Sequence, residues 1–209
     1  MNPATEVGGD FYDFFYTDEN HFVFLVADVS GKGIPAALFM MNAKSLLKNN
    51  IQNEEHIDIA ISKTNNELCN VSNSEMFVTA FIAKLNLETG EIEYVNAGHN
   101  PPLVRINGIY KYLDSETNIV LSAVEDFEYK SDKLKLGNKD GIFIYTDGVV
   151  EAQNQTEELY SEERLYKFLN ENELTPEELL PQLKKNIDEF AGGQTQYDDI
   201  TMLNLIYKK

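Results

Sequence analysis

The chain has 209 residues, of which 43% are hydrophobic and 11% aromatic, so it can bury one substantial core and is expected to form a single domain over residues 1–209. Its 17 basic and 35 acidic side chains give a formal net charge of −18, which disfavours binding to nucleic acid or to an anionic membrane surface. No apolar run approaches the ~20 residues of a membrane span, so we expect no membrane insertion. Cys69 is the sole cysteine and no secretory leader is seen, so we expect the protein to be located in the reducing cytoplasm.

The first predicted elements are a strand and two helices. Residues 22–27 form an apolar run rich in strand-forming side chains, which predicts a strand buried on both faces and ending at Asp28. Beyond a glycine-containing loop, Pro35 suits a first helical turn, and apolar residues at 34, 37, 38 and 41 have helical spacing. A helix is therefore expected to about Lys48, and a second one with the same spacing over about 56–70.

Antiparallel strands are predicted next. Residues 76–87 and 91–97 are strand-like and are joined by a short turn in which Gly90 can adopt a positive φ. Asn107-Gly108, between the strand-like runs 103–106 and 109–112, is the typical sequence of a type I′ hairpin turn. Further strands are predicted over 127–136 and 141–146, and the second of these leads into Asp147.

The last third of the chain predicts a second pair of helices and a final strand. One helix is expected over 161–171, and another starts at Thr175-Pro176, where a capping box is followed by an apolar face. Glycines at 192 and 193 end it, and residues 200–207 form the last strand. This order of elements predicts an α+β fold, in which antiparallel sheets are covered by pairs of helices.

Acidic residues recur at predicted strand ends or tight turns. They are Asp10, Asp28, Asp147 and the pair Asp198-Asp199. A single aspartate beside a glycine is usually a solvated turn residue, but carboxylates that gather without a cation repel one another. Because Mg²⁺ and Mn²⁺ prefer oxygen ligands, the set predicts a metal site. Two ions about 3.5–4 Å apart would activate a water for attack on phosphorus, which predicts phosphoester hydrolysis.

Five short motifs occur in order along nearly the whole chain. They are GGDFYD at 8–13, DVSGKG at 28–33, NAGHNPP at 96–102, TDG at 146–148 and DDIT at 198–201. Together they resemble the motifs of the bacterial PP2C-type (PPM) serine/threonine phosphatases of the SpoIIE and RsbU group. The resemblance implies a PP2C-like β-sandwich of two antiparallel sheets flanked by pairs of helices, with two Mn²⁺ or Mg²⁺ ions bound at one end.

The resemblance also implies roles for individual residues. Asp28 matches the carboxylate that bridges both ions, and the Val29 carbonyl matches the backbone ligand beside it. Asp147 and Asp198 match ligands of the first ion, and Asp10 matches an acid of the second, acting directly or through water. These four aspartates would be catalytic through a metal-activated water.

Two further acids in the motifs have open roles. Asp199 matches a position that either binds metal or orients the loop. Asp13 is interpreted as a structural acid or as one that supports the ligands.

The sequence departs from the family pattern at two functions. Ser30 stands where eukaryotic members have a proposed histidine general acid, and a serine cannot fill that role at neutral pH. His99 is either a substitute or, as we favour, a loop-packing residue. The phosphate-binding arginine of the eukaryotic members has no counterpart near the first motif, so the ions are expected to hold phosphate. Lys32 or the amides at the start of the helix over 34–48 would assist them.

The resemblance implies a phosphorylated STAS-domain anti-sigma-factor antagonist as substrate. The alternative is a catalytically weak or inactive binding module with the same fold, which the missing arginine and histidine favour. Clustered carboxylates argue against that alternative, because retaining them without a cation is costly. A two-metal nuclease is disfavoured by the charge of −18.

The family also has a strand before its first motif, often preceded by a sensor region. The chain begins only a few residues before Gly8, so a sheet edge would be left unpaired. We expect the first strand and any N-terminal sensor region to lie outside these residues, the other possibility being that another chain completes the edge.

Overall fold

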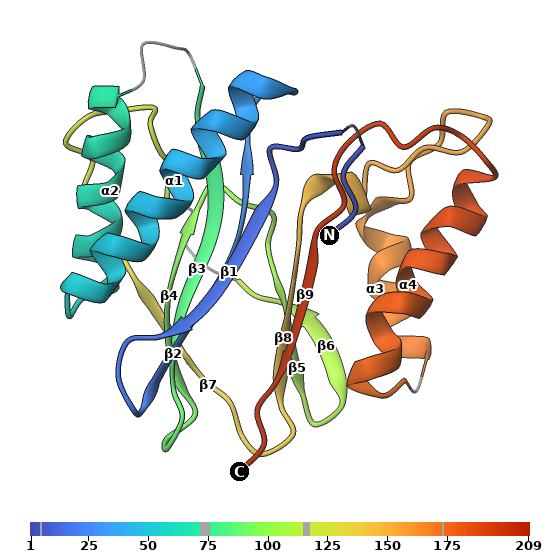
Figure 1. Ribbon diagram of the computed structural model, residues 1–209. Coiled ribbons are helices and arrows are strands. Elements are labelled where there is room, and N and C mark those ends of the chain that lie inside the picture. The colour runs from blue at the N-terminus through green and yellow to red at the C-terminus, as the bar shows by residue number, and fades with distance from the viewer. Residues whose placement is uncertain (5, 72–75, 115–117, 173) are drawn as a thin grey trace.

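Two antiparallel sheets pack face to face, and each carries a pair of helices on its outer side, as the computed structural model shows for residues 1–4, 6–71, 76–114, 118–172 and 174–209 (Figure 1). The first sheet has the order β1-β2-β3-β4-β7, with β1 Phe11–Tyr16, β2 His21–Val29, β3 Val78–Asn86, β4 Glu91–Ala97 and β7 Asp132–Lys135. The second has the order β6-β5-β8-β9, with β5 Leu103–Ile106, β6 Ile109–Tyr112, β8 Gly141–Tyr145 and β9 Met202–Ile206. The predicted α+β sandwich is confirmed.

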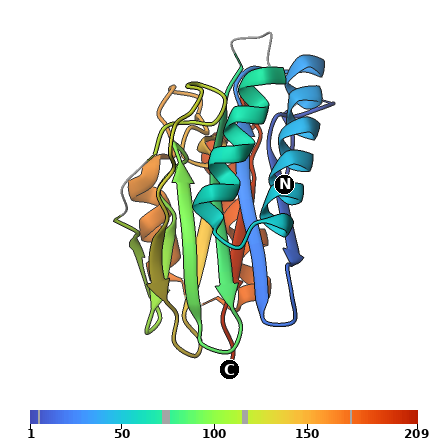
Figure 2. The same ribbon diagram turned by 90° about the vertical axis from the view of Figure 1, so that its left-hand side faces the viewer.

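The helices cover the two outer faces (Figures 1 and 2). They are α1 Ile34–Asn53 and α2 Ile57–Val71 on the first sheet, and α3 Ser161–Glu171 and α4 Pro176–Ala191 on the second. Three layers of buried side chains result, because both faces of each sheet are covered. Within the described ranges, none of these helices combines the length and apolar character that crossing a membrane requires.

The buried run in β2 explains why this strand lies near the middle of the first sheet. Val23 and Leu25 face the layer under α1 and α2, whereas Phe24 and Val26 face the second sheet. All four side chains are essentially inaccessible to water. The prediction of a strand buried on both faces is confirmed, and it continues through Asp28 to Val29.

The predicted turns and caps are confirmed where glycine or capping chemistry determines the backbone. Asn107 and Gly108 both have positive φ, 51° and 89°, as a type I′ turn requires, and Gly90 has a φ of 75°. Thr175 and Glu178 form the reciprocal capping box of α4.

One strand was missed, and another is shorter than predicted. β1 was not predicted, because it begins within the first motif and its aromatic residues lack the alternation of a half-buried strand. Strand pairing over the predicted 127–136 is limited to β7, which aligns with β4 over four residues.

The helix α1 forms where predicted, but a different face of it is buried. Its buried side chains include Ala36, Phe39, Ala43 and Leu47, which pack on the sheet and α2. By contrast, Ile34, Leu38 and Met41 are 69%, 60% and 61% exposed. Helical spacing predicted the helix, but it could not show which of two apolar faces the sheet covers.

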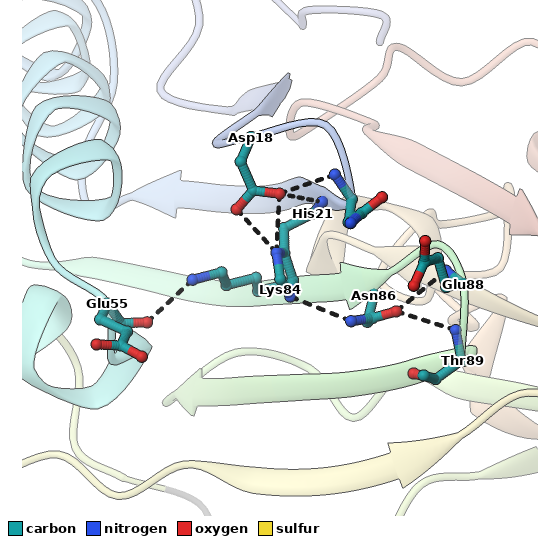
Figure 3. Close-up of polar contacts among 8 residues, drawn as sticks. Asp18, His21, Glu55, Lys84, Asn86, Glu88 and Thr89 are labelled. Carbon is teal, nitrogen blue, oxygen red and sulfur yellow. Dashed lines mark hydrogen bonds and ion pairs between the residues drawn. The ribbon is translucent and has the colours of Figure 1, made fainter.

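One end of the first sheet is closed by turns that polar side chains cap (Figure 3). The Asp18 carboxylate accepts the N–H groups of Asn20 and His21 and contacts the His21 ring. The Asn86 side-chain carbonyl accepts the N–H groups of the next turn, at Glu88 and Thr89. Tight turns therefore occupy this end, and the motif residues lie at the opposite end.

Candidate metal centre

The predicted acids come together at the end of the sandwich where β2 and β8 finish and β1 and β9 begin (Figure 1). Asp10 directly precedes β1, and Asp28 is the penultimate residue of β2. Asp147 opens the short turn Asp147–Val149 after β8, and Asp198 and Asp199 precede β9. Each sheet thus contributes aspartates to one place, although up to about 190 residues separate them in sequence.

Asp10 joins the two sheets through buried hydrogen bonds. The Thr146 hydroxyl donates to Asp10 Oδ2 at 2.8 Å, and the Thr201 N–H donates to the Thr146 hydroxyl at 3.0 Å. All three residues are buried. Thr146 therefore fixes one carboxylate oxygen of Asp10, Oδ2, in a buried position.

Asp10 is buried, and Asp28 and Asp147 beside it are half-buried. Burial raises the pKa of Asp28 to about 9, and repulsion from Asp10 and Asp147 adds to the effect. Burial also raises the pKa of Asp10 to about 7, and it raises the pKa of Asp147. Repulsion between carboxylates this close to one another favours protonation, and a bound cation would relieve the same repulsion.

Asp199 is used to hold the loop. Its Oδ1 accepts the Ala4 N–H at 2.8 Å and its Oδ2 accepts the Asp10 N–H at 3.3 Å. A Cβ atom at Gly8 would lie 2.0 Å from Asp199 Oδ2, so only glycine allows this approach. Of the two predicted roles of Asp199, orientation of the loop is the one supported by these contacts.

Lys32 and Asp198 lie at the mouth of the cluster. The Lys32 ammonium lies 3.0 Å from Asp198 Oδ2, donates to the Tyr197 carbonyl at 2.6 Å and lies 3.9 Å from the centre of the Tyr197 ring. A small pocket here is lined by Gly8, Gly9, Asp28, Gly31, Lys32, Gly33, Asp198 and Asp199, among others. Lys32 therefore neutralises one predicted metal ligand at the pocket.

The donor chemistry fits hard divalent cations, since oxygen donors gather at a buried position and raise each other's pKa values. The Val29 carbonyl is close to the first motif, 2.8 Å from where a Cβ at Gly9 would lie. Within the ranges that the structure describes, however, no three acidic, histidine or cysteine side chains are near enough to one another to hold one ion. Ion binding therefore requires these side chains to move closer together.

Three other candidate residues have structural contacts. The Ser30 hydroxyl accepts the Phe77 N–H at 2.9 Å. Burial lowers the pKa of His99 to about 4, and its Nδ1 lies 2.9 Å from the Thr79 hydroxyl, so it is a neutral packing residue. Asp13 accepts the Phe14 N–H and lies 3.7 Å from the Lys48 ammonium, beside α1.

The hydroxyl of Thr146 and the ring of Tyr197 are parts of the site that sequence reasoning did not identify. Thr146 lies within a recognised motif, but only the tertiary structure shows that its hydroxyl meets Asp10. Tyr197 carries no sequence signal beyond its position beside Asp198.

A family model described as Stage II sporulation protein E (SpoIIE) matches residues 18–207. The chain is 27% identical over 230 residues to Protein IcfG of Synechocystis sp. (strain ATCC 27184 / PCC 6803 / Kazusa), covering 97% of this chain and 36% of that protein. It is 30% identical over 154 residues to the phosphoserine phosphatase RsbU of Bacillus subtilis (strain 168), covering 73% of this chain and 46% of that protein. The chain thus spans less than half the length of these relatives.

Solved structures share the fold. The SiaA-PP2C domain of Pseudomonas aeruginosa superimposes with a TM-score of 0.86 at 19% identity, covering 99% of this chain and 84% of that one. The PP2C phosphatase domain of SpoIIE from Bacillus subtilis, solved with a fragment of its regulatory domain, gives 0.82 at 18% identity, covering 96% and 58%. RsbX, in complex with magnesium, gives 0.70 at 20% identity, covering 99% and 92%. With its ordered motifs, its sandwich and a family match over residues 18–207, the chain belongs to the SpoIIE family of PP2C-type domains.

Proposed function

We propose that the chain is a metal-dependent protein serine/threonine phosphatase. The observation that carries the proposal is the convergence of Asp10, Asp28, Asp147 and Asp198, from both sheets, at one end of the sandwich. The names of the relatives RsbU and RsbP, each a phosphoserine phosphatase, support the same reaction. The proposed substrate is a phosphorylated STAS-domain protein, within a partner-switching pathway in the cytoplasm.

The proposed ion ligands are Asp10, Asp28, the Val29 carbonyl, Asp147 and Asp198, with two Mn²⁺ or Mg²⁺ ions as the fitting cofactors. When bound, the ions supply an activated water for in-line attack on the phosphorus of the phosphoserine. Thr146 fixes the orientation of the Asp10 carboxylate, and Asp199 holds the loop that carries Asp10. Once Asp198 is engaged elsewhere, the Lys32 ammonium is free to contact the substrate phosphate.

The first test is phosphate release from a phosphoserine STAS-domain protein with Mn²⁺, Mg²⁺ or EDTA. We expect turnover with a divalent ion, none with EDTA, and a loss of at least 100-fold in Asp28→Asn and Asp147→Asn, since each removes a charged ligand. The matched control is Asp132→Asn, which makes the same chemical change on the edge strand β7. Turnover that persists in EDTA or in Asp28→Asn would exclude the metal-dependent reaction.

A binding module without catalysis is the second candidate, and the ion pair of Lys32 with Asp198 favours it. In such a module the lysine would be a permanent replacement for the cation. Calorimetric titration with Mn²⁺ distinguishes the two functions, because a phosphatase requires saturable binding of two ions and a module does not. If titration of the folded protein with Mn²⁺ gave no heat of binding, the result would favour the binding module.

A further inference from the structure

Three exposed apolar side chains form a row on α1, next to the acidic cluster. Ile34, Leu38 and Met41 are 69%, 60% and 61% exposed, and we call them the α1 stripe. Their spacing of four and three residues places them on one face of the helix, and a rise of 1.5 Å per residue gives the row a length of about 10 Å. Isolated exposed apolar residues are ordinary, but a contiguous row indicates an interaction surface.

The α1 stripe begins at the mouth of the pocket. Ile34 follows Gly33, which lines the pocket together with Asp28 and Asp198. Figures 1 and 2 both show α1 beginning at the end of the sandwich where β2 finishes. Anything that covers the pocket therefore also approaches the first turns of α1.

The helix that carries the α1 stripe is held firmly on the sheet. The Lys44 ammonium donates to the Tyr12 carbonyl at 3.0 Å, and the Lys48 ammonium lies 3.7 Å from Asp13 Oδ2. Ala36, Phe39 and Ala43 are buried on the opposite side of the helix. The stripe is thus an ordered surface, which lowers the entropic cost of binding.

The net charge of the chain does not favour a phosphorylated protein. The chain has a net charge of −18, and a phosphoserine adds about −1.5 to −2 to its carrier. These charges repel each other, so short-range burial of apolar surface is a source of affinity that would offset the repulsion. The α1 stripe provides such surface beside the pocket.

We propose that the α1 stripe is the docking surface for the folded phosphoprotein substrate, an inference that rests on the proposed function. A phosphoserine on a folded domain reaches the pocket only when that domain lies against the surrounding surface. The substrate is accordingly expected to present an apolar patch beside its phosphoserine, and that patch contacts Leu38 and Met41. The α1 stripe then selects the substrate, while the acidic cluster performs the reaction.

The test compares two substrates of the Mn²⁺-loaded chain: a phosphoserine STAS-domain protein and p-nitrophenyl phosphate, which has no folded surface to dock on the stripe. The measured quantity is the ratio of kcat/KM for the phosphoprotein to kcat/KM for the small ester. We expect this ratio to fall at least tenfold in the double variant Leu38→Glu/Met41→Glu. A smaller fall, of about threefold to tenfold, is expected in Leu38→Ala/Met41→Ala, which removes apolar surface without adding charge.

The matched control is Ile59→Glu, at a residue that is 51% exposed on α2. This residue lies three positions after His56, which lines a hollow with His21 and Asn86 at the end of the sheet closed by turns. The control should keep the ratio within about twofold of wild type, since one added charge changes little at a distance.

Three outcomes would overturn the inference. An unchanged ratio in the glutamate variants would show that the substrate docks elsewhere. Wild-type turnover of the small ester without turnover of the phosphoprotein would contradict a surface that selects this class of folded substrate. A change in sedimentation without a change in the ratio would assign the stripe to contact between copies of the chain. A wild-type protein inactive on both compounds would instead overturn the proposed function itself.

Discussion

Asp28 is a residue at which function and folding stability oppose each other. Its folded-state pKa of about 9 lies above the ordinary aspartate value of 3.8, so the folded protein without metal binds a proton that the unfolded chain releases. The stability that the folded protein gains from binding this proton is fully present below pH 3.8 and is lost as the pH rises toward 9. The pKa of Asp10 is raised to about 7, so Asp10 also makes the folded protein less stable as the pH rises.

We therefore expect Asp28→Asn to stabilise the metal-free protein, and to do so by at least about 1 kcal/mol more at pH 8 than at pH 5. The physical reason is that asparagine needs no proton at high pH. Urea unfolding in EDTA at both pH values measures the effect, with Asp132→Asn as the control. If the stabilisation by Asp28→Asn did not depend on pH, burial would not raise the pKa of Asp28 in the folded protein.

Lys32 competes with divalent ions for Asp198. The pair is partly exposed, so its contribution is small, in the range of about 0–1 kcal/mol. We expect Lys32→Met to raise the affinity for Mn²⁺ by about twofold to fivefold, because the ion no longer displaces an ammonium group. Calorimetry beside Lys63→Met, which breaks a pair with Glu54 far from the pocket, provides the comparison. Equal Mn²⁺ affinities in wild type and Lys32→Met would mean that breaking the Lys32–Asp198 ion pair costs no free energy.

At the scale of elements, the close approach of two loops builds the site. The turn after β8 and the loop before β9 touch at Gly148, where a Cβ would lie 2.1 Å from the Asp199 carbonyl oxygen. These loops carry Asp147 and Asp198, so their separation determines whether the two carboxylates can share an ion.

Gly148→Ala is expected to lower the free energy of unfolding by about 1–3 kcal/mol and to weaken Mn²⁺ binding at least tenfold. The added methyl group has to push the two loops apart. Thermal melting and calorimetry measure the two effects. Gly193→Ala, where nothing lies within 4 Å, is the control and should lose stability only through its φ of 87° while keeping its metal affinity. Undiminished metal binding in Gly148→Ala would show that the loops are not a rigid unit.

At the scale of the whole molecule, the sandwich has an open edge at β9 (Figure 1). The Asn2 backbone exchanges two hydrogen bonds with Ile200, at 2.8 and 2.9 Å, just before this strand begins. Since Thr201 bonds inward to Thr146, alternation directs the backbone groups of Met202 and Asn204 to the open side. A groove of about 540 Å³ between β1 and β9 is lined there by apolar side chains that include Phe14, Phe22 and Leu205.

The prediction that a further strand completes a sheet edge remains a prediction, and we assign it to the edge at β9. We expect a chain extended upstream of Met1 to melt several degrees higher than residues 1–209 and to protect the Met202 and Asn204 amides from hydrogen exchange. Pairing would satisfy the outward backbone groups and cover Phe14, which is 58% exposed. The Leu203 amide, which faces β8, serves as the internal reference. Unchanged protection at all three amides would indicate that the edge stays open.

The sequence by itself determined the features that depend on local chemistry. Asn107-Gly108 specifies its turn, Thr175 with Glu178 specifies a helix start, and the apolar run of β2 specifies a buried strand, because each acts through neighbours in the chain. The ordered motifs also identified the family and the candidate acids. None of these inferences needed the distance between two remote residues.

Only the tertiary structure decided what depends on distance and burial. It showed that Thr146 orients Asp10, that Asp199 holds a loop, and that Lys32 already neutralises Asp198. It also showed that Leu38 and Met41 are exposed, although they are apolar and have the same helical spacing as residues of a buried face. The physical reason is that burial, pKa shifts and contacts arise when segments far apart in the chain pack together, and helical periodicity alone does not say which face is covered.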